Sequence, residues 1–384
     1  MNQPLSYHNT GVNYDVLDEF KRNCQRSAAT TVDLLSQHGA KEPAGIRGES
    51  AYLVETEDQY LAHVEEGLGT KNLVADAMIK LAEGKGTEAE NRAAKFYHSI
   101  AIDTVGTIVN DLLTVGALPL AVAMHAAVGN AKWFENVERA KQLAEGFAAG
   151  CRQAGAVWGG GETPALRGLV EQEAIILAGS AMGTIRPKHL RISGEVKHGD
   201  AMIFVASSGV HANGLTLCRQ LAERLPEGYL TKLPSGRSYG EVLLDPSVIY
   251  SGLIRGCQQA NLPIHYAVHL TGHGWRKLMR LEESFVYRVT NIGKVPEIFP
   301  FIAKTAGLDA QEMYGTFNMG LGFALYVAQA DAEKCVAIAK AAGFDAWVGG
   351  TIEKQGDRKA VVIEGAGESG KSLEYDGASL AIRG

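Results

Sequence analysis

The sequence predicts an α+β protein of two domains, and three observations indicate this fold class. The chain has 384 residues, more than the roughly 150 that one domain usually takes, and it is 46% hydrophobic and 21% charged, as in ordinary globular proteins. Apolar runs typical of strands alternate with segments of helical spacing in both halves. Each half also contains a glycine-rich turn followed by a helix, which indicates two related domains without an obvious sequence repeat.

The first half is expected to contain an N-terminal helix and a glycine-containing segment over residues 1–48, and then a domain over residues 49–187. Helices are expected where apolar residues recur every three or four positions, and strands where short apolar runs are bounded by Gly or Pro. Gly39 is expected to stop the first helix and Gly155 to cap the last. The expected helices cover 15–38, 72–95, 100–115 and 131–154, and the expected strands cover 51–58, 117–128, 156–165 and 173–185.

The second half is expected to form another α+β domain over residues 188–364, followed by a tail over 365–384. Its expected strands cover 199–209, 317–329, 345–353 and 359–364, and its expected helices cover 211–225, 249–260 and 331–343. The tail contains GAGESGKS at 365–372, which matches the P-loop pattern. Only twelve residues follow that match, too few for the helix and sheet that a P-loop needs, so a mobile or edge-packed tail is expected.

Charge and apolar content argue against two classes of partner. The net charge is −6, and no basic run occurs, so nucleic acid is not expected to bind. The most apolar stretch, residues 112–124, is too short for a membrane span and contains Gly116 and Pro119. An acidic protein that handles phosphates usually needs a metal ion to offset the repulsion.

The cysteines and the N-terminus indicate a reducing compartment. Five scattered cysteines without a CxxC pair argue against a disulfide framework or a structural zinc site. Residues 1–15 lack a basic region followed by an apolar one, so no signal peptide is expected and the protein is predicted to be cytoplasmic.

A first chemical motif is EEGLGTK at residues 65–71. Its glycines would let backbone N–H groups point at phosphate oxygens, and Lys71 adds a mobile positive charge. An ordinary surface turn with solvated charges fits the same residues, because short glycine patterns are weak evidence.

A second motif places two carboxylates in the apolar helix expected over 100–115. Asp111 follows Asp103 by eight residues, about two helical turns, so both can face one side. A buried carboxylate needs a cation or hydrogen bonds to stay ionised. The pattern therefore indicates a metal or substrate role, with a salt-bridged core residue as the alternative.

Two further glycine motifs could approach a ligand. In GGGET at 159–163, Glu162 could supply an oxygen to Mg²⁺, or the segment could be an exposed β-turn. SSGVHANG at 207–214 leads into a helix and forms a potential anion site, where His211 and Asn213 could touch substrate, although Asn213 could instead cap the helix.

Two motifs in the second half carry weaker signals. HLTGHG at 269–274 has two histidines four apart, but without a third His or a Cys nearby zinc is not favoured. MYGTFNMG at 313–320 is interpreted as a loop entering a strand, with its aromatic residues in core packing.

Taken in order, these segments resemble one family. GLGTK, VNDLLTVGALPL, GGET, SSGVHANG, HLTGHG and MYGTFNMGLG, with the opening GVNYD, are similar to successive motifs of aminoimidazole ribonucleotide synthetase, the phosphoribosylformylglycinamidine cyclo-ligase. The likeness covers about residues 11–364. It implies that family's two-domain fold, with N-terminal domains pairing into a barrel in a homodimer and a C-terminal α/β sandwich domain. Selenophosphate synthetase, thiamine monophosphate kinase and the hydrogenase-maturation dehydratase belong to the same superfamily.

The resemblance also implies ligands and residue roles. In the family, ATP activates an amide oxygen of formylglycinamidine ribonucleotide, a small phosphorylated metabolite, and a substrate nitrogen closes the imidazole ring with release of ADP and phosphate. By position in the motifs, Mg²⁺ would be held by Glu66, Asp111 and Glu162. The expected catalytic residues are Asp111, Lys71, His211 and His269. The residues expected to contact ATP are Gly67, Gly69, Thr70, Lys71, Asn110, Gly160, Gly161, Thr163 and Asn213.

Departures from the family pattern leave the substrate open. Glu66 stands where the family has Asp. SIAID at 99–103 stands where the family has an Asp-x-x-Gly-x-Asp pattern, so one carboxylate, at Ser99, and one glycine are missing. His273 replaces a glycine, which would narrow the pocket. The sequence is therefore compatible with the cyclo-ligase, with a relative that uses ATP to phosphorylate or dehydrate another substrate, and with a non-catalytic nucleotide-binding protein.

Overall fold

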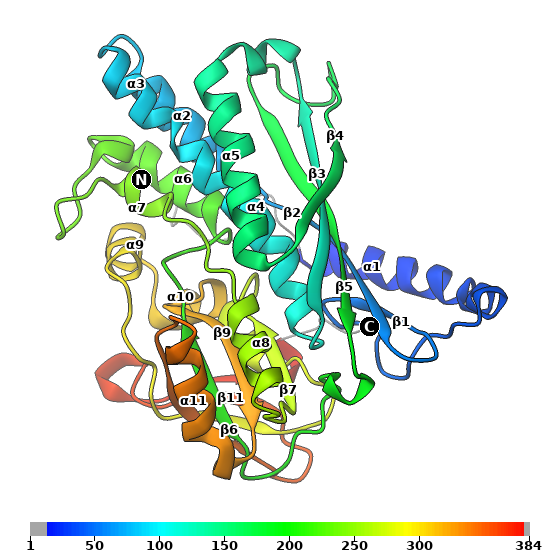
Figure 1. Ribbon diagram of the computed structural model, residues 1–384. Coiled ribbons are helices and arrows are strands. Elements are labelled where there is room, and N and C mark those ends of the chain that lie inside the picture. Colours follow the sequence, from blue (N-terminus) through cyan, green and yellow to red (C-terminus); the bar gives the residue numbers. More distant parts are fainter. Residues whose placement is uncertain (1–13, 380–384) are drawn as a thin grey trace.

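A computed structural model describes residues 14–379. Residues 1–13, which include most of the GVNYD opening and of the segment examined for a signal peptide, lie outside the described residues. It confirms the α+β fold with two domains, of which the N-terminal one lies above the C-terminal one in Figure 1. Within residues 14–379, no helix combines the length and apolar character that a membrane span needs.

The N-terminal domain is a five-stranded sheet covered by helices on one face. The strand order is β1-β2-β5-β3-β4, with antiparallel neighbours except for the parallel pair β3 and β4. Helices α4 and α5 cover the sheet face on the left of Figure 1. The elements are α1 (Tyr14–Ala29), β1 (Tyr52–Glu55), β2 (Tyr60–Gly67), α2 (Asn72–Ala82), α3 (Thr87–Ala94), α4 (Phe96–Leu113), β3 (Leu118–Val128), α5 (Val137–Ala154), β4 (Val157–Glu162) and β5 (Ile175–Ile185).

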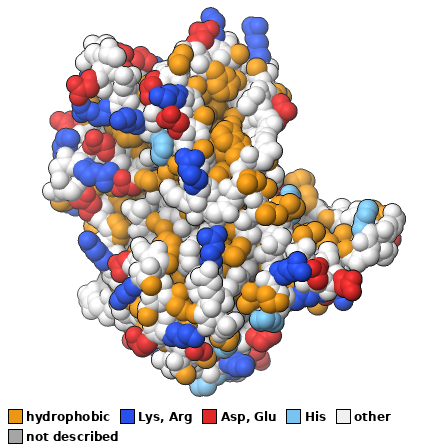
Figure 2. All heavy atoms as spheres, viewed as in Figure 1, with side chains coloured by type: hydrophobic (Ala, Val, Ile, Leu, Met, Phe, Trp, Pro, Cys, Tyr) orange, Lys and Arg blue, Asp and Glu red, His pale blue; other side chains and the backbone are white. Residues whose placement is uncertain are grey.

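The other face of this sheet exposes apolar side chains. Residues of β5 alternate between buried and accessible, as expected for a strand with one face on the core, yet the outward positions carry Ile176 and Met182. Leu120 and Val157 on other strands of the sheet are also exposed, and apolar atoms gather beside these strands in Figure 2. Exposed apolar side chains on an open sheet face are more common where a protein contacts a partner than on the rest of a surface.

The C-terminal domain is a seven-stranded mixed sheet in the order β12-β11-β8-β10-β6-β9-β7. Strands β6 and β9 are buried along nearly their whole length, because helices and loops cover both faces. The elements are β6 (Ala201–Ala206), α6 (Leu215–Arg224), α7 (Tyr239–Leu243), α8 (Ser251–Gln259), β7 (Tyr266–His269), β8 (Val286–Val289), α9 (Ile298–Ala306), α10 (Ala310–Thr316), β9 (Leu321–Val327), α11 (Ala332–Ala341), β10 (Ala346–Glu353), β11 (Ala360–Ile363) and β12 (Leu373–Asp376).

Several local expectations need correction. The helix expected over 15–38 ends at Ala29, and a separate 3₁₀ helix, η2 (Val32–His38), stops at the left-handed Gly39. The three glycines of GGGET continue β4 and do not form a turn. Helix α10 occupies the first half of the segment interpreted as a loop at 313–320, and Asp309 caps its N-terminus.

The P-loop-like pattern at 365–372 is the connection of a β-hairpin. It joins β11 to the antiparallel β12, with Ile363 opposite Leu373, so the tail lies at the edge of the C-terminal sheet. A phosphate-binding loop of this pattern needs a helix N-terminus immediately after it. A strand stands there instead, which removes the pattern from the candidate sites.

Helix α4 forms much of the contact between the domains. A polar stripe runs along it at Asp103, Thr107, Asn110 and Asp111, positions i, i+4, i+7 and i+8, which lie on one helical face. The amide of Asn110 donates to Val248 O at 2.9 Å and accepts from Tyr250 N at 3.0 Å. The predicted placement of Asp103 and Asp111 on one side of the helix is therefore correct, and that side faces the second domain.

Candidate functional site

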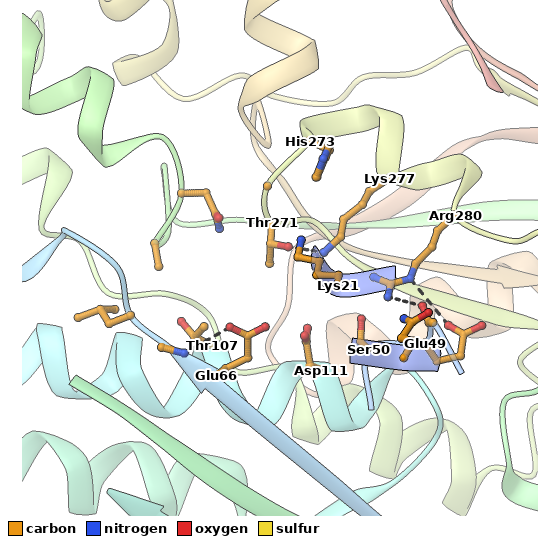
Figure 3. A pocket seen from close by; sticks show the side chains of 17 residues that line it. Lys21, Glu49, Ser50, Glu66, Thr107, Asp111, Thr271, His273, Lys277 and Arg280 are labelled. Atoms are coloured by element: carbon orange, nitrogen blue, oxygen red, sulfur yellow. Dashed lines mark hydrogen bonds and ion pairs between the residues drawn. The ribbon is translucent and has the colours of Figure 1, made fainter. Parts of the chain in front are cut away.

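A cavity of about 490 Å³ lies where the two domains meet. Its size falls in the range of about 300–1,000 Å³ that is typical of small-molecule sites. Segments from both domains contribute to its wall, as Figure 3 shows. The lining residues are Lys21, Gln25, Gly48, Glu49, Ser50, Glu66, Gly67, Leu68, Thr107, Asp111, Ala212, Asn213, Thr271, Gly272, His273, Lys277 and Arg280.

One wall of the cavity is acidic. Glu66 stands at the end of β2, and Thr107 and Asp111 lie one helical turn apart on α4, so that all three side chains point up into the cavity in Figure 3. Burial and the charge of Asp111 raise the pKa of Glu66 to about 7. Because carboxylate and hydroxyl oxygens are hard donors and Mg²⁺ commonly takes one or two protein carboxylates, this wall fits a divalent cation.

His269 holds Asp111 in place. Its Nδ1 lies 2.8 Å from Asp111 Oδ1, and both side chains are buried. Burial acts to raise the pKa of Asp111, but the hydrogen bond from His269 and the charges of Lys277 and Arg280 outweigh it and lower the pKa overall. Burial lowers the pKa of His269, so a neutral ring that donates through Nδ1 satisfies the geometry. Asp111 is thus kept ionised at the cavity wall.

The opposite wall is basic and comes from the C-terminal domain. His273 adopts a left-handed conformation with φ of 71°, and the 3₁₀ helix η6 (Gly274–Met279) follows it. Lys277 on that helix donates to His269 O at 3.2 Å and to the Thr271 hydroxyl. Arg280 donates to Gly48 O at 2.7 Å. In Figure 3 these side chains hang from above, facing the carboxylates below them.

Lys71 does not reach this cavity, contrary to its predicted role as a mobile phosphate contact. Its side chain has no exposed surface, and its Nζ lies 2.8 Å from Asp103 Oδ2 and donates to Asp245 O at 2.7 Å. Asp103 also accepts from the backbone N and the hydroxyl of Ser247. The ammonium therefore takes part in a buried set of contacts between the domains, formed by Lys71, Asp103, Asp245 O and Ser247, which we call the clasp.

Glu162 is not near Asp111 within one chain, so a single subunit does not bring the three predicted metal ligands together. The registers place Gly67, Ala178, His125 and Glu162 in one row across β2, β5, β3 and β4. Three strand spacings separate the ends of that row, about 14 Å, whereas Mg²⁺ ligand oxygens lie only about 2 Å from the ion. Among residues 14–379, no cluster of three His, Cys, Asp or Glu side chains is arranged to hold a metal.

The remaining predicted residues divide into two groups. Gly67 and Asn213 line the cavity, as does Thr271 of the HLTGHG motif. His211 and His269 do not line it, since both rings are buried behind the wall; His211 Nε2 accepts from Ser208 N at 3.2 Å. The predicted nucleotide contacts that do not line it are Gly69, Thr70, Asn110, Gly160, Gly161 and Thr163. Asn213 does not cap the following helix, because Gly214 occupies that position without a side-chain bond.

Several wall residues were not predicted from the sequence. They are Lys21, Glu49, Thr107, Lys277 and Arg280. The run of Arg276, Lys277 and Arg280 directly after HLTGHG was a usable signal, because cations beside a glycine turn indicate anion binding. No local signal distinguishes Lys21 or Glu49, which reach the cavity only through the folding of the N-terminal segment.

Family models match the chain over most of its length. One described as "AIR synthase related protein, N-terminal domain" matches residues 48–185, and one described as "AIR synthase related protein, C-terminal domain" matches residues 197–363. A protein named phosphoribosylformylglycinamidine cyclo-ligase, from Carboxydothermus hydrogenoformans, is 32% identical over 370 residues, which cover 94% of this chain and 100% of that protein.

Solved structures share the fold at lower identity. HypE in a HypE–HypF complex superposes with a TM-score of 0.56 and 18% identity, over 85% of this chain and 93% of that one. PurL of T. maritima, solved in complex with ADP, superposes with a TM-score of 0.54 and 14% identity, over 87% of this chain and 46% of that one.

Proposed function

This chain belongs to the AIR synthase related family, and we propose from that premise that it is an ATP-dependent ligase forming a C–N bond. The proposed reaction converts formylglycinamidine ribonucleotide to aminoimidazole ribonucleotide in purine biosynthesis. The observation that carries this proposal is the interdomain cavity, with Glu66 and Asp111 on one wall and cationic side chains on the other. Such a cavity suits a Mg²⁺-bound nucleotide beside a small phosphorylated substrate.

The residues of the acidic wall have distinct parts in the proposed reaction. Mg²⁺ with ATP, when bound, supplies the phosphoryl group that turns the amide oxygen of the substrate into a leaving group. Asp111, oriented and kept ionised by His269, would be an anionic ligand for the cation. Glu66, whose pKa is about 7, would release its proton when the cation arrives and complete the charge balance. Positioning and charge neutralisation supply most of the catalysis in such transfers.

We also propose a homodimer that pairs through the open apolar face of the N-terminal sheet. Ile176, Met182 and Val157 are 49%, 42% and 62% exposed, so a second copy would bury substantial apolar surface there. Glu162 ends β4, the edge strand of the sheet that would pair with the second copy. The partner's Glu162 is therefore a candidate third carboxylate for the cavity. Cytoplasmic location is part of the proposal, since five cysteines are free.

Subunit complementation tests the shared site. Asp111→Asn and Glu162→Gln are each expected to be inactive, whereas mixed dimers have one site in which both residues are native. Random exchange makes about half of the dimers mixed, so the mixture should regain about a quarter of wild-type activity. If the activity of the exchanged mixture stays as low as that of the single variants, Glu162 lies outside the site.

Turnover tests the reaction itself. The purified chain is incubated with ATP, Mg²⁺ and formylglycinamidine ribonucleotide, beside a cyclo-ligase of known activity and an Asp111→Asn control. Aminoimidazole ribonucleotide should form with one ADP for each product. If the reference enzyme turns over and this chain does not, the cyclo-ligase assignment is rejected.

A second candidate is an ATP-dependent enzyme of the same family with a different substrate. It is favoured by His273, whose side chain lines the cavity at a position where the resemblance implies glycine. A screen of metabolites for Mg²⁺-dependent ADP release separates the candidates. ATP binding without ADP release on any amide or amidine substrate would instead support a non-catalytic nucleotide-binding protein.

A further inference from the structure

Lys277 is a buried cation that makes no direct ion pair with a carboxylate. The residue is 7% exposed, and in the described part of the chain no Asp or Glu oxygen lies within 4.0 Å of Nζ, although the charges of Asp111 and Glu66 act on it from across the cavity. Two neutral oxygens, His269 O and the Thr271 hydroxyl, accept from it. An ammonium carries three donors, and a buried charge needs compensation, so one donor remains for a ligand in the cavity that Lys277 lines.

Arg280 lies on the same side of the wall. Successive side chains three apart eclipse each other on a 3₁₀ helix, and Arg280 follows Lys277 by three residues at the end of η6. Its guanidinium is anchored by Gly48 O at 2.7 Å, while Nε stands 3.9 Å from Glu49. Gly48 O is neutral, so this anchor fixes the position of Arg280 without neutralising its charge. Glu49 offsets part of that charge, and Lys277 adds a second positive charge nearby.

Lys71 and Lys277 are both buried, but only Lys277 lines the cavity. Lys71, in the glycine turn, has its ammonium enclosed by Asp103 and Asp245 O and contributes nothing to the cavity wall. Lys277 faces the cavity across from Glu66 and Asp111 (Figure 3). Burial lowers the pKa of Lys277 to about 8, a shift that a bound anion would oppose.

We propose that Lys277 and Arg280 form a phosphate-binding subsite that takes over the contact usually expected of the lysine in the glycine turn. The bound phosphate belongs either to ATP or to the phosphorylated second substrate. This choice between two sources rests on the proposed function. Lys277 supplies the direct charge-assisted hydrogen bond, and Arg280 supplies a fixed positive potential beside it.

Calorimetry on the full-length chain with Mg²⁺ tests the subsite. The ligands are inorganic tripolyphosphate, ATP against AMP, and formylglycinamidine ribonucleotide against its unphosphorylated nucleoside. Lys277→Met removes the charge at similar volume, Lys277→Arg restores it, and Lys340→Met removes an exposed lysine on α11 as the matched control. Thermal unfolding checks that each variant is folded.

The subsite predicts a loss confined to ligands that carry the phosphate group bound by Lys277, which AMP lacks if that group belongs to the β,γ-phosphates of ATP. Lys277→Met should weaken tripolyphosphate and one phosphorylated ligand by about tenfold to a hundredfold, with AMP or the nucleoside unchanged. Loss for ATP but not for the ribonucleotide assigns the nucleotide chain, and the reverse assigns the second substrate. Lys277→Arg should recover most of the affinity.

Two results would overturn the subsite. One is wild-type affinity for all phosphorylated ligands in folded Lys277→Met; the other is a wild-type chain that binds none of them, tripolyphosphate included. The turnover assay judges the proposed function separately. A chain that binds tripolyphosphate through Lys277 but makes no aminoimidazole product retains the subsite and loses the cyclo-ligase assignment.

Discussion

Replacing Lys71 by Met should destabilise the protein strongly, although Lys71 does not line the cavity. The wild-type ammonium lies 2.8 Å from Asp103 Oδ2, and both side chains are fully buried. The substitution leaves Asp103 with only the two hydrogen bonds from Ser247, at 2.7 and 2.5 Å. Removing one partner of a buried ion pair typically costs about 3–5 kcal/mol, because the other charge stays uncompensated.

Protonation of Asp103 sets an upper limit to that loss. The ordinary pKa of the side chain is 3.8, so neutralising it at pH 7 costs about 4 kcal/mol at about 1.36 kcal/mol for each pH unit. We therefore expect a loss of about 3–4 kcal/mol at pH 7. Burial already raises the pKa of Asp103 in the wild type and raises it further without Lys71. A carboxyl whose folded-state pKa is raised contributes stability that is lost as pH rises. The stability difference between Lys71→Met and the wild type should therefore shrink by about 1.36 kcal/mol per pH unit as pH falls from 7 toward the wild-type pKa of Asp103.

Urea unfolding followed by tryptophan fluorescence between pH 5.5 and 8 measures this loss. Lys340→Met is the control for removing a lysine, with an expected change below about 0.5 kcal/mol because its side chain is exposed. The double variant Lys71→Met with Asp103→Asn should recover most of the loss at pH 7, since no charge remains buried. A loss under about 1 kcal/mol, or one that does not change with pH, would refute the clasp.

Three other predictions concern the metal site, a titrating carboxyl and the open sheet face. Asp111→Asn should lower kcat/KM at least about a hundredfold and abolish its dependence on Mg²⁺ concentration; an unchanged Mg²⁺ titration would argue against ligation by Asp111. Burial raises the pKa of Asp76 to about 6 despite the hydrogen bond from Tyr97 and the charge of Arg139, so this group contributes stability below about pH 4 that is lost as pH rises through 6. Asp76→Asn should flatten the stability profile in that window and add about 1–3 kcal/mol at pH 7.5, measured by the same unfolding assay; a profile that keeps its wild-type slope contradicts the shift. Met182→Lys should shift the mass in sizing chromatography with light scattering from two copies to one, whereas a dimer that persists would place the interface elsewhere.

Periodicity and glycine positions were enough to predict the elements that frame the site. Helix α4 follows from its apolar run, and the eight-residue spacing of Asp103 and Asp111 correctly indicated one shared face. Gly67 lines the cavity as the EEGLGTK pattern indicated, and Gly39 and Gly155 end helices in the left-handed conformation. These features depend on local geometry, which the sequence encodes directly.

The features that local patterns could not report depend on distances between segments. GGGET was expected to form a turn, but its glycines continue β4, and the strand order puts β4 three strands from β2 in the same chain; no local pattern reports strand order. Lys71 looked mobile because glycines precede it, yet Asp103 and the carbonyl of Asp245, from two other segments, enclose its ammonium. Lys277 went unnoticed because a lysine that follows an arginine is ordinary on a surface, and only tertiary packing buries it.

The polar stripe of α4 connects the position of the second domain to the charge state of the site. Its first member, Asp103, and its third, Asn110, grip the segment that carries Ser247 and Val248, while its last, Asp111, meets His269 from the end of β7. A shift of the C-terminal domain along α4 would therefore stretch the His269 bond that keeps Asp111 ionised. It would also carry Lys277 away from the carboxylates, since its ammonium is bonded to His269 O. The clasp and the cavity are thus one mechanical unit, and the stability lost in Lys71→Met should be accompanied by weaker Mg²⁺ binding even though Lys71 does not line the cavity.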